Sequence, residues 1–403
     1  MAVVSQHEVP DAGFSVALRR LRDPLLLLVA PVVFAMLIAF VGYGASWPIG
    51  FDFRGTLWEP ARALLDGLPI YPDPTREAIV IGNPTVYPPL FIVMSVPLAL
   101  IPVTAASWVW FCLLGACVLA STRILGVRDW RCHVLAITSP VVVHGLYYGN
   151  LTIFLLVPLA IAWRYRDRAR VAGVAVGVAV AAKLFVWPLV IWLLLTRRFA
   201  AAGWAVASAA AVALVAWAVI GFEGLADYPS LLRAVQDVYA IRSISLSTVA
   251  GAMGASTSVA VAVAALAGLV CVAVAAWLVR GPDGDRRAFA VLVAGCVLAT
   301  PIVWPNYAAL LLVPIAITWP RLAPAWFYGY AIWLAGALAP KPEVADVCCR
   351  PPGVPEQAWA SSHSDPEPWF AIGLAAGVIG VTVLVLAVRR DRPSAGGFAP
   401  VGP

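Results

Sequence analysis

Charged side chains are scarce in this chain. Asp, Glu, Lys and Arg make up 12% of its 403 residues, whereas 62% of the residues are hydrophobic. Because a soluble domain carries about a quarter charged residues, this composition excludes a soluble globular protein and predicts a polytopic membrane protein. The net charge of +6 is modest, and in a membrane protein it mainly reflects loops that face the cytoplasm. We therefore expect no nucleic-acid partner.

Patterns that bind metal ions are also lacking. The seven cysteines are scattered, and no Cys-His spacing is typical of a metal site. Asp52 has no second acid close by, which argues against a paired-carboxylate metal site. Cys348 and Cys349 are adjacent and could be redox-active, but we favour the interpretation of two exposed or partly packed thiols. The sequence predicts neither a metal ion nor a cofactor.

The apolar runs and the basic loops between them define a topology. Residues 1–24 are polar and place three arginines just before the first apolar run, so the positive-inside rule puts this tail in the cytoplasm. Residues 25–388 form one transmembrane domain of about twelve helices, since each basic loop fits the cytoplasmic side. The first span is predicted at residues 25–45, and later external loops are predicted at residues 221–257 and at residues 339–368, the last with Cys348, Cys349 and His363. Residues 389–403 form a Pro- and Gly-rich cytoplasmic tail that we expect to be disordered.

The run Leu90–Ile101 interrupts this regular pattern. It has about a dozen residues and contains Pro97, whereas a full span needs about 20 residues. If it crossed the membrane, the next span would leave Arg123, Arg128 and Arg131 outside, against the charge rule. We therefore predict that it is re-entrant.

The first external loop, residues 46–89, contains an amphipathic helix. Its apolar residues recur three or four positions apart on one face, and charged residues take the other. The apolar face comprises Leu57, Ala61, Leu64, Leu65 and Leu68, and the polar face comprises Glu59, Arg62 and Asp66. Gly67 suits the C-terminal cap. Such a helix would lie along a membrane surface, and we interpret the loop as the active-site loop of a membrane enzyme.

Lys183 stands between two short apolar arms. Each arm has about a dozen apolar residues, fewer than a span requires, so the outer turn is expected below the membrane surface in a cavity lined by protein. Ionisable residues are costly inside a membrane, so we expect one at such a place to have a functional role. The alternative is a lysine that extends its ammonium to the membrane interface.

Other polar and aromatic residues fall at the same outer turns and loops. They are Asp52, Tyr87, Tyr148, Asn150, Arg242, Trp304, Asn306 and Tyr307. Aromatic faces stack on sugar rings, Lys183 or Arg242 would hold a phosphate, and Asp52 would take a proton from an attacking hydroxyl. This set suits a sugar attached to an anionic lipid.

Each of these residues also has a structural interpretation. Asp52 could cap a loop or pair with Arg54, and the aromatic residues could form an interfacial belt. His133 and His144 are expected to be core or interfacial residues rather than ligands.

Several segments, in this order, resemble glycosyltransferase family 87. They read ARALLDGLPIYP, YPPLFIVMSVPLALIP, YYGNLTIFLL, GVAVGVAVAAKLFVWPLVIWLLLTRR and TPIVWPNYAALLLVP. The resemblance covers most of residues 25–340 and implies a GT-C fold, a polyprenyl-phosphate-sugar donor, inverting transfer with Asp52 as general base, and an active site on the outer face. The chain departs from the family pattern at Asn150, where Gln is usual, and at Pro305-Asn306, where one or two His are usual.

The sequence thus predicts an all-α, GT-C-type membrane glycosyltransferase of the plasma membrane. It would move one sugar, predicted to be mannose, from a polyprenyl-phosphate donor to an envelope glycolipid or polysaccharide. The first alternative is arabinofuranosyl transfer by the same mechanism. A lipid or solute transporter is the rival from another class, although no internal repeat is visible in the sequence. A non-catalytic membrane partner is a third possibility.

Overall fold

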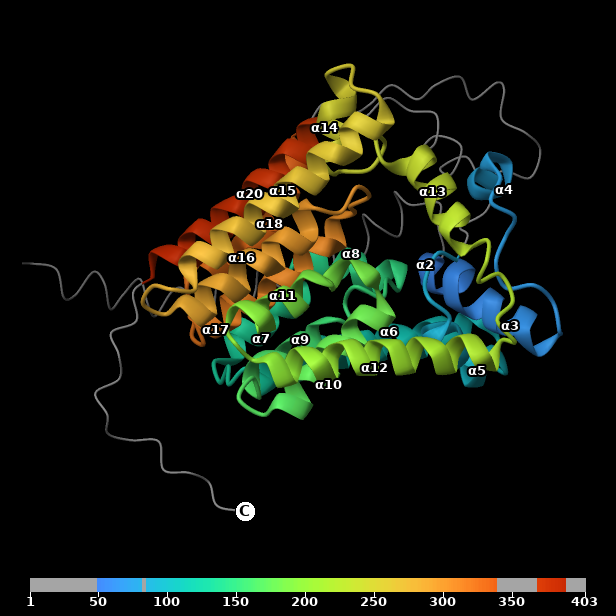
Figure 1. Ribbon diagram of the computed structural model, residues 1–403, viewed down its shortest axis with the longest axis horizontal. Coiled ribbons are helices and arrows are strands. Elements are labelled where there is room, and N and C mark those ends of the chain that lie inside the picture. Colours follow the sequence, from blue (N-terminus) through green and yellow to red (C-terminus); the bar gives the residue numbers. More distant parts are fainter. Residues whose placement is uncertain (1–48, 82–84, 339–367, 389–403) are drawn as a thin grey trace, which may run out of the picture.

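The computed structural model describes residues 49–81, 85–338 and 368–388. Every regular element within these ranges is a helix, which confirms the all-α prediction for this part of the chain (Figure 1). Several predicted features lie outside the described residues: the tail at 1–24, the first span at 25–45, the loop with Cys348, Cys349 and His363, and the tail at 389–403.

Within the described residues, four helices are long and apolar enough to cross a membrane. They are α6 (Val103–Ile124), α12 (Phe199–Val219), α15 (Thr257–Leu278) and α20 (Pro368–Ala387). A helix of about 20 residues is about 30 Å long, which matches the hydrocarbon thickness of a bilayer. These helices support a membrane protein, while the total of about twelve spans stays a prediction.

The remaining bundle is made of shorter helices. They are α7 (Trp130–Thr138), α8 (Pro140–Tyr148), α9 (Leu156–Arg164), α10 (Ala169–Ala182), α11 (Pro188–Leu195), α16 (Gly284–Leu298), α17 (Leu312–Thr318) and α18 (Tyr328–Ala337). Proline explains two of the breaks, because it lacks the N–H that a helix interior needs and fits the first turn of the next helix. Pro140 begins α8 directly after α7, and Pro188 begins α11.

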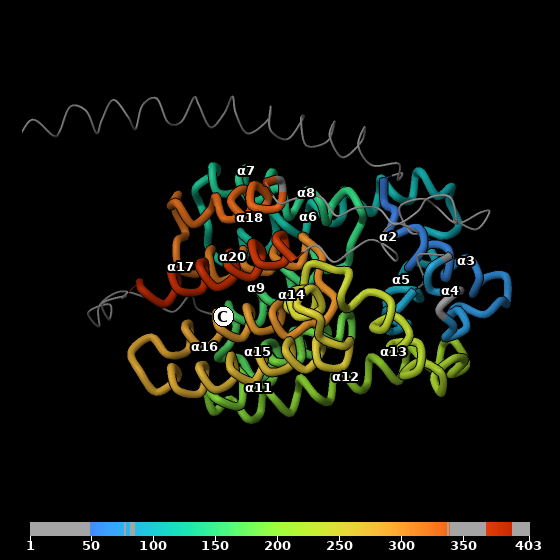
Figure 2. Tube along the Cα trace, turned by 90° about the horizontal axis from the view of Figure 1, so that it is seen from above, coloured from blue at the N-terminus to red at the C-terminus, as the bar shows by residue number. Residues whose placement is uncertain are grey.

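The core is centred on α16. Every residue from 288 to 298 is buried, and the helix packs against α11, α15 and α20 (Figure 2). Small residues allow this close packing: a Cβ atom on Gly295 would come within 2.9 Å of Cys271 Cβ on α15. The rigid centre holds the short helices around it in fixed positions.

The predicted amphipathic helix is present and is longer than expected. It runs without interruption through α2 (Phe51–Phe53), a π-helical segment η1 (Arg54–Trp58) and α3 (Glu59–Leu65). Gly67 ends it with φ +68°, and the Leu68 N–H donates to the carbonyl of Ala63 at 2.8 Å, as in a Schellman cap.

The predicted apolar face of this helix is divided. Leu57 and Ala61 are buried in the protein core, whereas Leu65 and Leu68 are 43% and 57% exposed. The buried part packs on α5 (Leu90–Ala99), and Trp58 Nε1 donates to the Leu98 carbonyl at 3.1 Å. Half of the face thus contacts protein, and only the last turn offers leucines to a membrane surface.

The segment predicted to be re-entrant forms the ten-residue helix α5, with Pro97 inside it. Such a helix is about 15 Å long, half the thickness of the hydrocarbon core. The re-entrant path itself stays a prediction.

The second predicted external loop, residues 221–257, contains two helices. They are α13 (Tyr228–Tyr239) and α14 (Leu246–Ala252). α13 packs against α4 (Arg76–Ile81) from the first loop, and both figures show these two helices side by side. Their contact buries a small separate cluster made of Ile79, Val80, Leu231 and Val238. The two loops therefore form one layer over the end of the bundle.

Candidate active site

A cavity of about 580 Å³ lies beneath this layer. It is bounded by α2, residues 86–88, the end of α8, α13, the turn after α10 and residues 300–307. Eight of the predicted site residues line it: Asp52, Tyr87, Tyr148, Asn150, Lys183, Trp304, Asn306 and Tyr307. Segments far apart in the sequence are thus brought to one place.

Two glycines join the Asp52 segment to the end of α8. Gly50 and Gly149 both have positive φ, at +75° and +71°, and the Gly50 N–H donates to the Tyr147 carbonyl at 2.7 Å. A Cβ atom on Gly149 would lie 2.8 Å from Phe53 Cβ, so only glycine fits here without displacement. Trp110 Nε1 also donates to the Gly149 carbonyl at 2.8 Å. This close approach places Asn150 beside Asp52.

The Asn150 amide links the acid to the lysine. Its Nδ2 donates to Asp52 Oδ2 at 2.6 Å, and its Oδ1 accepts from Lys183 Nζ at 3.3 Å. The Thr152 N–H and hydroxyl also donate to this oxygen, at 3.0 and 2.8 Å. Since Oδ1 must face these donors, the Nδ2 group must face the carboxylate. The amide is therefore held in one orientation.

Lys183 is buried at 7% exposure, and aromatic rings surround its ammonium group. Nζ lies 4.2 Å from the ring centroid of Tyr307, 5.3 Å from that of Tyr87 and 5.5 Å from that of Phe185. It donates to Thr152 Oγ1 at 2.8 Å, in addition to the bond to Asn150. Among the described residues no carboxylate lies within ion-pair distance of Nζ. All of its hydrogen bonds and ring contacts are to neutral groups, the Asp52 carboxylate acts on it only from a distance, and the cation remains able to bind an anion.

Two tyrosines fix the chain at Tyr87. Tyr71 Oη donates to the Tyr87 carbonyl and Tyr228 Oη donates to the Val86 carbonyl, both at 2.8 Å. The Tyr71 ring stacks on Trp217 with centroids 5.5 Å apart. Burial raises the pKa of the Tyr87 phenol well above its usual value, and the nearby Asp52 and Tyr307 raise it further, while Asn150 acts in the opposite direction. Burial also raises the pKa of Tyr228. Both phenols therefore stay neutral and can donate hydrogen bonds.

The opposite wall is the segment from Thr300 to Tyr307. The Ile244 N–H donates to the Val303 carbonyl at 3.0 Å, and Ser245 Oγ donates to the Pro301 carbonyl at 2.8 Å. These bonds hold the wall against the start of α14.

Asn306 is 1% exposed on this wall, and it lies next to the imidazole of His144. Neither Asn306 Nδ2 nor His144 Nδ1 has a hydrogen-bond partner among the described residues. His144 stacks on Tyr148 with ring centroids 4.6 Å apart. The sequence favoured a core or interfacial role for His144, whereas its ring lines the cavity.

Several lining residues were not predicted from the sequence. They include Phe185 and one face of α13, made of Tyr228, Leu232, Val235, Gln236 and Tyr239. The spacing of these α13 residues is the signal that was available, since residues three or four apart share a helix face. Thr152, which bonds to both Asn150 and Lys183, had no distinguishing signal beyond its place two residues after Asn150.

Arg242 is not among the residues that line the cavity. Its Nη1 donates to the Val238 carbonyl at 3.3 Å, at the end of α13. Within the part of the chain that the structure describes, no group of three or more His, Cys, Asp or Glu side chains is arranged to hold a metal ion.

The arrangement combines three chemical capabilities in one enclosed space. A carboxylate can accept a proton, a buried ammonium can bind an anion, and several aromatic faces and amide groups can bind a ring that carries hydroxyls. Asn150 fixes the relation between the first two groups.

Comparison with known proteins finds a match to one protein family. The family model described as Glycosyltransferase family 87 matches residues 85–305, which is more than half of the 403 residues. The matched segment contains Tyr87, Asn150, Lys183 and Trp304, and Asp52 lies upstream of it. No curated protein and no solved structure matches the chain.

Proposed function

The chain belongs to glycosyltransferase family 87, and from this premise we propose that it moves a single sugar from a polyprenyl-phosphate carrier to a cell-envelope glycolipid or polysaccharide. Mannose is the proposed sugar, and the transfer inverts the configuration at the anomeric carbon. The proposed place is the plasma membrane, with the cavity open to the outside.

The observation that carries this proposal is the connection between Asp52 and Lys183. The two side chains line one cavity and are bridged by a single amide, that of Asn150. An inverting transfer requires a base on one side of the anomeric carbon and a group that binds the departing phosphate on the other. Asp52 and Lys183 are suited to these two roles.

In the proposed reaction, the acceptor hydroxyl oxygen attacks the anomeric carbon while Asp52 takes the hydroxyl proton. The bond between that carbon and the phosphate oxygen breaks, and its electron pair leaves with the polyprenyl phosphate. Charge on the phosphate grows as this bond breaks, so the Lys183 ammonium binds the transition state more strongly than the ground state. One displacement of this kind inverts the anomeric centre.

The neutral residues of the cavity would orient the sugar. The rings of Tyr87, Tyr148, Trp304 and Tyr307 offer faces for stacking, and Asn306 Nδ2 offers a buried donor for a sugar hydroxyl. Water is a competing acceptor, and the layer formed by α4 and α13 would limit its entry.

The central test is an assay of purified protein with polyprenyl-phosphate-mannose and, separately, with polyprenyl-phosphate-arabinose, each with a panel of envelope acceptors. We expect consumption of the mannose donor together with formation of a glycosylated acceptor. Turnover of only the arabinose donor would show that the transferred sugar is arabinose and not mannose. Movement of a lipid or solute across vesicles with no covalent change would favour transport and contradict the proposal.

The proposed orientation is tested by cysteine labelling after removal of the native cysteines. A cysteine in place of Asp66, which is exposed next to the predicted external helix, should react with an impermeant thiol reagent on intact cells. A cysteine in place of the exposed Arg128 should react only after permeabilisation. Labelling of the second position on intact cells would show that the assigned sides are wrong.

A further inference from the structure

A second cavity lies at the other end of α10, α11 and α12. Its volume is about 630 Å³, and it is bounded by the end of α11, the start of α12 and the end of α15. The start of α10 packs on the start of α12, where a Cβ atom on Gly173 would meet the Ala201 carbonyl. Since α10 has 14 residues and leads to Lys183, this cavity lies about 20 Å from the lysine.

Positive charge dominates this second cavity. Arg197, Arg198 and Arg280 line it, together with one carboxylate among the described residues, Asp285. Arg197 and Arg280 are exposed, and no carboxylate of the described chain lies within ion-pair distance of either. They differ in this from Arg198, which bonds to Asp285 and to Asp167.

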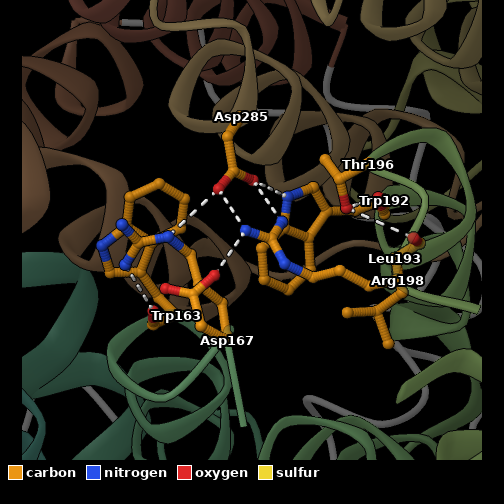
Figure 3. Close-up of polar contacts among 8 residues, drawn as sticks. Trp163, Asp167, Trp192, Leu193, Thr196, Arg198 and Asp285 are labelled. Carbon is orange, nitrogen blue, oxygen red and sulfur yellow. Dashed lines mark hydrogen bonds and ion pairs between the residues drawn. The ribbon is translucent and has the colours of Figure 1, made fainter. Parts of the chain in front are cut away.

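The charge of Asp285 is already balanced. Its carboxylate accepts four hydrogen bonds, from Trp192 Nε1 at 2.8 Å, from Arg166 Nε at 3.0 Å and from Arg198 Nη1 and Nη2 at 3.0 and 2.9 Å. Figure 3 shows dashed lines from the carboxylate of Asp285 to Trp192 and to the guanidinium of Arg198, which also contacts Asp167. Two guanidinium groups match this acid, so it has no capacity left to neutralise Arg197 and Arg280.

Exposed large apolar side chains occur at the same helix ends as the arginines. Leu194, Phe199 and Trp277 are 44%, 65% and 70% exposed, at the same ends of α11, α12 and α15. α12 and α15 are two of the helices that are able to cross a membrane. The polar head of a ligand at this site would therefore contact the arginines, and the rest of the ligand would contact an apolar surface. That combination is typical of a phospholipid.

We propose that this cavity binds the phosphodiester head group of an anionic phospholipid through Arg197 and Arg280. The planar guanidinium groups suit bidentate bonds to phosphate oxygens, and Arg198 remains held by its ion pairs with Asp285 and Asp167. The acyl chains would lie along the exposed side chains of α12 and α15. Lipid binding at this end is independent of sugar transfer at the other.

The test is a lipid titration of the full-length purified protein in a neutral detergent, read by native mass spectrometry. We expect phosphatidylglycerol to bind the wild type at least tenfold more tightly than phosphatidylcholine. The variant R197Q/R280Q should lose about tenfold or more of the phosphatidylglycerol affinity and keep the phosphatidylcholine affinity.

The matched control is R123Q/R128Q, which removes two exposed arginines from the end of α6 and the segment after it and changes the net charge equally. It should bind phosphatidylglycerol as the wild type does. An equal loss of phosphatidylglycerol affinity in both double variants would mean that surface charge alone attracts the lipid. Unchanged affinity in R197Q/R280Q would show that the cavity is not a lipid-binding site. Displacement of phosphatidylglycerol by inorganic phosphate at similar affinity would also overturn the proposal, because the site would then recognise a free anion. Thermal unfolding of each variant confirms that it is folded.

Discussion

Lys183 and Arg286 are the two buried charged residues in the described part of the chain, and their bonding partners differ. Arg286 is 1% exposed and is fully bonded: it pairs with Asp283, donates to Thr318 Oγ1 at 3.0 Å, and donates to the carbonyls of Val385 and Val388 at 2.7 Å. Lys183 has two neutral oxygen partners and three aromatic rings.

The difference separates a structural cation, Arg286, from one that we propose to bind a ligand, Lys183. Arg286 ties the start of α16 to the last turn of α20, whose terminal carbonyls have no partner within their own helix. A buried charge with a full set of partners holds elements together, and losing it leaves those partners unsatisfied. A buried charge without a bonded opposite charge costs stability, and in the proposed function the donor phosphate would supply that charge to Lys183.

The largest effect is expected from Asp52→Asn, which tests the chemistry at the Lys183 end. Asparagine keeps the size of the side chain and can still accept the Asn150 hydrogen bond, but it cannot take a proton. Turnover should fall by roughly 10²–10⁴-fold, while donor binding should change little. The control Asp66→Asn alters an exposed acid that pairs with Arg62 and should be silent. An Asp52→Asn enzyme with more than half of the wild-type rate would refute the assignment.

Arg286→Met should lower the stability of the fold and leave the rate of sugar transfer unchanged. It leaves Asp283 without its guanidinium and the carbonyls of Val385 and Val388 without their donor. The loss should be about 3 kcal/mol, at the low end for a broken buried pair because Asp283 is partly exposed. Thermal unfolding in detergent measures it, and the rate per folded molecule should stay near that of the wild type. A wild-type unfolding temperature would show that the contacts of Arg286 contribute little.

Lys183→Met should give the opposite result. Methionine fills a similar volume and removes an unpaired buried charge, so the unfolding temperature should stay the same or rise. Donor affinity and turnover should both fall, by roughly 10- to 100-fold, since a charge-assisted hydrogen bond to phosphate contributes about 1.5–3 kcal/mol. Normal donor binding with normal turnover would show that the phosphate is held elsewhere.

The sequence was informative about both cations, but to different degrees. A lone lysine between two apolar arms is unusual in a membrane segment, so Lys183 was singled out correctly as a cavity residue. Arg286 lies in a basic loop next to Arg287 and looked like ordinary positive-inside charge. Its burial depends on the C-terminal end of α20, about a hundred residues later, which no local pattern reveals.

Site residues in short motifs were predictable, and those brought in by tertiary packing were not. Tyr87, Tyr148, Asn150 and Trp304 lie in segments that resemble the family, and all line the cavity. α13 was treated as part of a loop because residues 221–257 read as an interval between spans, although its apolar face has helical spacing. Arg242 was chosen for its charge and its place in a predicted external loop, and neither specifies on which side of a helix end a side chain lies.

The smallest effect is expected at the contact that brings Asp52 to Asn150. Gly149→Ala introduces a Cβ atom 2.8 Å from Phe53 Cβ and 3.1 Å from Trp110 Cδ1, at a residue with φ +71°. Gly126→Ala is the matched control, because Gly126 has φ +81° and a Cβ atom added there would have nothing within 4 Å. Both variants carry the same backbone penalty of about 1 kcal/mol, and only the first must push α2 away from the end of α8.

The two variants separate backbone strain from the geometry of the site. If the distance between Asp52 and Asn150 matters, Gly149→Ala should lower turnover per folded molecule several-fold beyond Gly126→Ala, since a displacement of about 1 Å can greatly reduce a rate. The added clash should also cost Gly149→Ala more stability than Gly126→Ala loses. The measurements are turnover and thermal unfolding of both variants side by side. Equal turnover would mean that Phe53 and Trp110 adjust without moving Asp52. In that case the carboxylate is positioned by its own helix, and the Asn150 bridge follows from the fold without being needed for the reaction.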